Sequence, residues 1–92
     1  MVNLTTPHKT FMFNNTRVNI YNADEGEGLS KHTHAYSHLT VCISGKCAIR
    51  KENIYLEIDK NSDPLLLKEQ EWHEIEALED NTIFSNMFVE GF

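Results

Sequence analysis

The sequence predicts an all-β fold, and three features support that prediction. Short segments rich in apolar and β-branched residues recur along the 92 residues, and turn-forming residues separate them. No internal repeat, linker or low-complexity block interrupts this pattern, and only two prolines occur. We therefore expect one small domain that spans residues 1–92.

The expected strands alternate in polarity where they are long enough to judge. Val18 and Ile20 share one face of their segment, and Ile54, Leu56 and Ile58 share one face of theirs. Loops are expected at 22–28 and 59–64. In chain order the expected strands are 11–13, 17–21, 30–44, 47–51, 54–58, 65–67 and 82–89.

The acidic segment 68–80 allows two interpretations. It is rich in helix formers, and Trp72, Ile75 and Leu78 recur every three residues, which slightly favours a helix on local grounds. A strand would instead place His73, Ile75 and Ala77 on one face. Periodicity does not decide between helix and strand in so short a segment.

Charge and hydropathy exclude some classes of function. The net charge is −6, and the basic residues are scattered. They form no basic stripe that could neutralise phosphates, so we expect no nucleic-acid partner. The longest apolar run is 65–67, far short of a membrane span, so we expect no membrane association. The N-terminus has no charged start followed by an apolar stretch, which predicts a cytoplasmic protein.

The two cysteines predict buried thiols. If Ser44 and Gly45 form a two-residue hairpin turn, Cys42 and Cys47 lie directly opposite each other on its strands. Such a register would permit a disulfide, but a reducing compartment favours two small buried thiols.

Three of the five histidines lie within seven positions, at His32, His34 and His38. Side chains of like parity point to the same face of a strand, so all three share a face. Three such histidines could be surface or capping residues, or ligands of one metal ion. A straight strand would separate the first and third by about 20 Å. A shared ion therefore requires a bend, which we expect at Tyr36.

The spacing around these histidines resembles the first motif of the cupins, a family of small antiparallel β-barrels, or jelly rolls. Gly26, five residues, His32-Thr33-His34, three residues, His38, six residues and Gly45 match that motif at every interval. In the motif, two histidines and a glutamate bind a metal, and a glycine ends the strand. Here His38 stands in the place of the glutamate.

The resemblance continues more weakly to the second cupin motif, which supplies a fourth ligand. His73 stands where that histidine is expected, although Lys68, Gln70 and Ala77 replace the usual Pro, Gly and Asn. The resemblance covers about 18–88. It implies that 68–72 is a turn and that 73–77 is a strand, because tertiary context overrides helix propensity.

The resemblance implies one divalent transition metal (Fe, Mn, Ni, Zn or Cu) on His32, His34, His38 and His73. We expect Tyr36 and Thr40 to line the pocket.

Two functions remain open. One is a metal-dependent, dioxygenase-like oxidoreductase or isomerase acting on a small molecule that chelates the metal. The other is a non-catalytic module that binds a small ligand or the metal. A homodimer is expected, with the segment 1–17 packing on a partner subunit and residues 11–13 adding to the partner's sheet edge.

Overall fold

The computed structural model describes residues 1–89, which form ten strands and no helix, and the all-β prediction is confirmed. Among these residues no helix could therefore serve as an apolar membrane span. The strands are β1 (Val2–Asn3), β2 (Lys9–Phe13), β3 (Thr16–Ala23), β4 (Glu27–His32), β5 (His38–Ser44), β6 (Lys46–Lys51), β7 (Ile54–Asp59), β8 (Leu65–Leu67), β9 (His73–Ala77) and β10 (Thr82–Val89).

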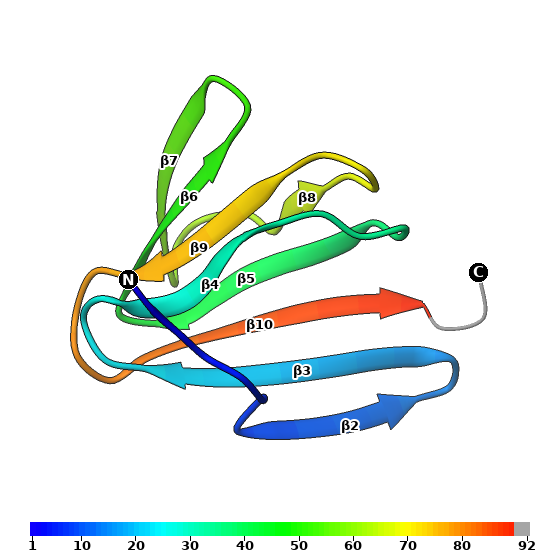
Figure 1. The fold of residues 1–92 in the computed structure, drawn as a ribbon. Helices are drawn as coiled ribbons and strands as arrows, with labels where there is room; N and C mark the ends of the chain where they lie inside the picture. Colours follow the sequence, from blue (N-terminus) through cyan, green and yellow to red (C-terminus); the bar gives the residue numbers. More distant parts are fainter. Residues whose placement is uncertain (90–92) are drawn as a thin grey trace.

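The strands form two five-stranded sheets that face each other (Figure 1). The first sheet has the order β1-β4-β9-β6-β7 and the second the order β2-β3-β10-β5-β8. Within the described residues, β1 pairs with β4 in parallel and the other pairings are antiparallel. Successive strands often switch sheets, as β3 and β4 do, which is the arrangement of a jelly roll.

The apolar core lies between the sheets, where each strand turns every second side chain inward. At its centre Tyr21 of β3 stacks on Phe84 of β10, with ring centroids 5.0 Å apart. The first sheet contributes Ile49 and Ile75, and neither is exposed to solvent. The interior also buries polar residues, among them His38, Thr40 and His73.

The ambiguous segment is a strand, as the resemblance predicted. β9 spans His73–Ala77, and its inward residues His73, Ile75 and Ala77 are fully buried. A turn precedes it, with Gln70 at a φ of 63°. The local preference for a helix is overridden because the strand lies between β4 and β6 and completes the ladder of the first sheet.

The hairpin predicted at Ser44-Gly45 is wrong. β5 and β6 belong to different sheets, and the chain crosses between them at Gly45, which has a φ of 78°. Cys42 and Cys47 nevertheless approach inside the core, with their Sγ atoms 3.9 Å apart, and both are free thiols. Burial raises the pKa of each thiol, which keeps both protonated and unreactive at neutral pH.

The start of the N-terminal segment pairs within its own chain. It forms β1 on β4, through Val2 paired with Glu27 and Asn3 with Gly28. β2 then forms an edge of the second sheet, and Phe13 at its end is 71% exposed. The packing of this segment on a partner subunit stays a prediction.

Gly28 allows β9 to approach β4 closely. A Cβ at this position would overlap the carbonyl oxygen of Ile75 and lie 2.9 Å from the Cα of Glu76, both backbone atoms that cannot move aside cheaply. Gly28→Ala is therefore expected to lower the free energy of unfolding by about 3 kcal/mol, measured by urea titration. Gly26→Ala is the comparison, because its Cβ would meet open space and only its positive φ opposes it, at about 1 kcal/mol. Equal losses in the two variants would contradict the close approach.

Candidate metal centre

The predicted bend is present between β4 and β5. β4 ends at His32, β5 begins at His38, and the chain bends at Ala35 and Tyr36 between them. Two bonds tie this connection to the turn before β9. The Gln70 amide donates to the carbonyl of His34 at 2.9 Å, and the Glu69 amide donates to Ser37 Oγ at 3.1 Å.

The bend brings all four predicted histidines together. His73 of β9 lies directly opposite His32 of β4 in the sheet. His32, His34 and His73 each offer a nitrogen within 4.8 Å of the others. His38 joins from the second sheet, with its Nε2 3.3 Å from that of His73. Five of the ring pairs in this cluster have centroids 4.4–5.3 Å apart.

Each histidine of the cluster has an outer hydrogen bond at Nδ1. His32 Nδ1 lies 2.6 Å from the Ser30 carbonyl, His34 Nδ1 lies 2.7 Å from the Tyr36 carbonyl, and His73 Nδ1 lies 3.1 Å from the Glu71 carbonyl. A carbonyl only accepts, so Nδ1 carries the proton in these three rings. Their Nε2 atoms are left with lone pairs, so each ring can bind a metal through Nε2.

The fourth ring is fixed through side chains instead. His38 Nδ1 lies 3.1 Å from Thr40 Oγ1, and Thr40 Oγ1 donates to Asn86 Oδ1 at 2.7 Å. Since the hydroxyl proton is used on Asn86, the hydroxyl oxygen accepts from His38 Nδ1. Nε2 of His38 therefore also carries a lone pair, and it faces that of His73.

This donor set fits a metal ion. Two lone pairs 3.3 Å apart in a buried place repel each other unless a cation or a proton lies between them. Nitrogens that share one ion at ~2.1 Å lie about 3.0–3.4 Å apart at right or tetrahedral angles, which matches the separation of His38 and His73. Imidazole nitrogen suits Zn, Cu, Fe and Ni.

Burial keeps the inner histidines neutral. Desolvation first, and then the neighbouring imidazoles, lower the pKa of His38 to about 3. Desolvation and His32 lower the pKa of His73 to about 4, and desolvation lowers the pKa of His34. Neutral imidazole is the form that binds a metal, so the site is ready for an ion at pH 7.

These pKa values predict acid sensitivity of the metal-free protein. In the unfolded chain, His38 and His73 take up protons below about pH 6.5, whereas in the folded chain they do so only near pH 3–4. The free energy of unfolding should therefore fall as the pH drops from about 6.5 to 4, by up to about 1.4 kcal/mol per pH unit for each histidine. Urea titrations in chelator across this range would measure the slope. His73→Gln should reduce the slope by the contribution of one histidine. An unchanged slope would contradict the lowered pKa of His73.

A cavity of about 280 Å³ opens beside the cluster between the two sheets. Tyr36 lines it as predicted, with its ring stacked between His34 at 4.1 Å and Phe88 at 4.4 Å. Thr40 does not line it, which corrects the prediction. Thr40 is fully buried and lies behind His38, where it holds the ring instead of contacting a ligand.

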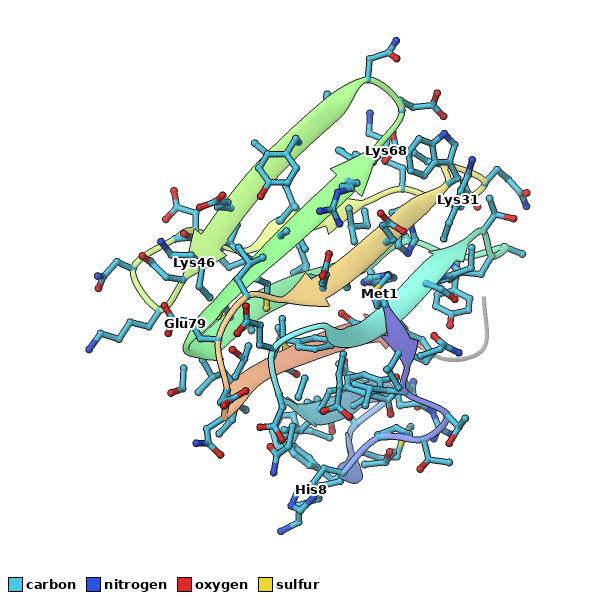
Figure 2. All side chains as sticks on the ribbon, turned by 60° about the vertical axis from the view of Figure 1, so that its left-hand side comes forward. Met1, His8, Lys31, Lys46, Lys68 and Glu79 are labelled. Carbon is cyan, nitrogen blue, oxygen red and sulfur yellow. The ribbon has the colours of Figure 1, made fainter. Side chains whose placement is uncertain are left out.

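The fifth histidine, His8, lies outside the cluster. It is exposed near the start of β2, and Figure 2 shows it well away from Lys31, the residue before His32.

Sequence reasoning missed the cavity residues on the second sheet. Asn19 and Tyr21 of β3 and Asn86 of β10 line the cavity. One signal was available in β10, where Asn86 interrupts the inward row of Phe84 and Phe88. A polar residue in an apolar row is typical of a site, but the sequence does not reveal what it faces.

No family model matches the chain, and no curated protein matches it. Solved structures do. A cupin-2 domain protein from Shewanella frigidimarina superposes with a TM-score of 0.74 at 9% identity, covering 95% of this chain and 85% of that one. A Klebsiella pneumoniae protein with a double-stranded β-helix domain superposes with a TM-score of 0.74 at 21% identity, covering 95% of this chain and 75% of that one. KdgF from Halomonas superposes with a TM-score of 0.78 at 14% identity, covering 89% of this chain and 76% of that one.

These likenesses establish the fold. The chain folds as a small cupin, and the resemblance predicted from its histidine motif is confirmed at that level. Its histidine cluster is one that could hold a metal.

Proposed function

We propose that His32, His34, His38 and His73 bind one divalent transition metal ion, Fe, Mn, Ni, Zn or Cu, and that the cavity holds a small molecule that chelates it. One observation carries the proposal. Each Nδ1 has an outer hydrogen-bond partner, which leaves the lone pair of every ring on Nε2. Histidines that bind a metal almost always donate their other ring N–H to an outer acceptor in this way.

The donor set determines the charge of the site. Four neutral imidazoles leave the full +2 charge on the ion, whereas a set with a glutamate would leave +1. A bound divalent ion would supply Lewis acidity and open positions for an anionic, bidentate ligand. The chain supplies the rest: the buried rings of His38 and His73 are held in place, and Tyr36 covers His34.

A dioxygenase-like oxidation of the chelating molecule is the catalytic function that we propose. The residues that line the cavity within 1–89 include no Asp, Glu, Lys or Arg. The cavity wall that these residues form therefore offers a ligand no charged acid or base, which favours chemistry driven by the metal over acid–base catalysis. The alternative is a non-catalytic module that holds the ligand or the metal.

Metal analysis and oxygen uptake separate these functions. Protein purified without added metal should contain about one transition metal ion per chain. Oxygen consumption with diketone, thiol and phenolic panels would support the dioxygenase-like oxidation. Stoichiometric metal without turnover would support the binding module. A protein that takes up no transition metal would overturn the metal site and the dioxygenase-like oxidation, and would leave a module that holds only the small ligand.

We further propose that two copies pair through the outer face of the second sheet. An apolar row crosses all five strands of this face in direct register, from Phe11 through Val18, Met87 and Leu39 to Leu66. Phe11, Leu39 and Leu66 are 40–46% exposed. Strand spacing and length give the face on the order of 500 Å² in flat projection. Side-chain relief brings this towards the ~800 Å² that each partner buries in a stable dimer.

Light scattering at micromolar concentration should therefore give twice the chain mass of 10.6 kDa. Leu39→Lys should yield a monomer, because it places a charge in the middle of the apolar row. Ile54→Lys is the matched control, since Ile54 is equally apolar and 49% exposed but lies on β7 of the other sheet. A monomeric wild-type protein would contradict the pairing.

A further inference from the structure

A polar row crosses the inner face of the second sheet, where an apolar core would be expected. Thr10 lies directly opposite Asn19, Asn19 opposite Asn86, and Asn86 opposite Thr40. On each strand, the residue of this inner row is adjacent in sequence to a residue of the outer apolar row. The inner face is therefore polar and the outer face apolar at this level of the sheet, the reverse of the usual pattern. Such a reversal costs stability unless the polar groups have partners.

The hydrogen bonds within the inner row use one side of each amide. Thr10 Oγ1 donates to Asn19 Oδ1 at 2.9 Å, and Thr40 Oγ1 donates to Asn86 Oδ1 at 2.7 Å. Because the Thr40 hydroxyl gives its proton to Asn86 Oδ1, its oxygen accepts from His38 Nδ1. Each amide oxygen thus accepts a hydroxyl proton, and the NH₂ groups of Asn19 and Asn86 are left to donate in the cavity that these residues line.

The opposite wall repeats the arrangement. Asn3 of β1 accepts at its Oδ1 from the backbone amide of Ser30 at 2.9 Å and from the Ser30 hydroxyl at 3.2 Å. A backbone amide can only donate, so the orientation of Asn3 is fixed and its NH₂ group is also left to donate. Tyr21 lines the cavity between the two walls and adds a phenolic hydroxyl.

We propose that this cavity selects a small carboxylate with a second oxygen, such as an α-keto or α-hydroxy acid. The inference rests on the proposed metal site, because the second oxygen of the carboxylate ligand would bind the metal there. Three amides whose oxygens are used present hydrogen-bond donors, and carboxylate and carbonyl oxygens are acceptors only. A cationic ligand would meet three NH₂ donors, and every amide oxygen near it already accepts a hydrogen bond. The volume of about 280 Å³ limits the molecule to a few carbon atoms beyond the chelating group.

Isothermal titration of the zinc-loaded protein with pyruvate, lactate and malonate tests the proposal, with ethanolamine as a cationic probe of similar size. The carboxylates should bind and ethanolamine should not. Asn19→Asp replaces the NH₂ donor with a charged acceptor and should weaken carboxylate binding at least 10-fold. Asn22→Asp is the matched control, because Asn22 lies on the same strand, is exposed and gains the same charge. It should change the affinity less than 2-fold.

Tyr21→Phe keeps the stack on Phe84 and removes only the hydroxyl, so a weaker carboxylate affinity in this variant would support the proposal even if Asn19→Asp failed to fold. Zinc content measured in parallel distinguishes the two proposals. Intact zinc binding with no carboxylate binding, or with binding that Asn19→Asp and Tyr21→Phe leave unchanged, would overturn the carboxylate site alone. Loss of zinc from the wild-type protein would overturn the metal site. The titrations repeated on metal-free protein would then test the amide donors by themselves.

Discussion

His73→Ala is expected to lower the affinity for Zn²⁺ by more than about 100-fold. Loss of an outer hydrogen-bond partner of a metal ligand already costs 10–100-fold, and His73 is itself a proposed ligand. It is fully buried, lies opposite His32 in the sheet, and has its Nε2 3.3 Å from that of His38. Removing it leaves one side of the cluster without a donor. Competition titration with a chromogenic chelator would measure the change.

His8→Ala is the control for this measurement, because His8 is exposed and lies outside the cluster. It should leave zinc affinity unchanged. Thr40→Val should fall between the two variants, with a loss of about 10–100-fold, since it removes only the outer partner of His38. Zinc affinity that is the same in His73→Ala and His8→Ala would refute the four-histidine site.

Removing the metal is expected to lower the melting temperature by about 15–30 °C. A ligand at 1,000 times its dissociation constant stabilises the folded state by about 4 kcal/mol. Each kcal/mol shifts the melting temperature of a domain of this size by about 4–8 °C. The effect is large because a domain of 92 residues has a small hydrophobic core and therefore a small free energy of unfolding. Scanning calorimetry with and without a strong chelator would measure the shift.

The shift should reverse when zinc is restored and should not reverse with calcium, because calcium prefers oxygen ligands and the cluster offers nitrogen. His73→Ala should melt at the same temperature with and without chelator. If the melting temperature of the wild-type protein is the same with and without chelator, no metal contributes to the stability of its folded state.

The sequence by itself predicted most of the strands and singled out three of the four clustered histidines. Local alternation and turn residues predicted the strands, because side chains on a strand alternate between core and solvent. The spacing of His32, His34 and His38 required a bend near Tyr36, since a straight strand keeps its residues too far apart to share an ion. His73 was found by resemblance alone. The structure brings nitrogens of His32, His34 and His73 within 4.8 Å of one another, and it places Nε2 of His38 3.3 Å from that of His73.

Only the tertiary structure decided how these residues are held and what faces them. Which strands become neighbours depends on closing long loops against the whole core, and no short window of sequence records that choice. The crossing at Gly45 therefore replaced a predicted hairpin, and Thr40 proved to hold His38 rather than line the pocket. Asn19 and Asn86, 67 positions apart along the chain, became direct neighbours through register. A cross-strand row is set by pairing between distant segments, so its donors become visible only once the sheets have closed.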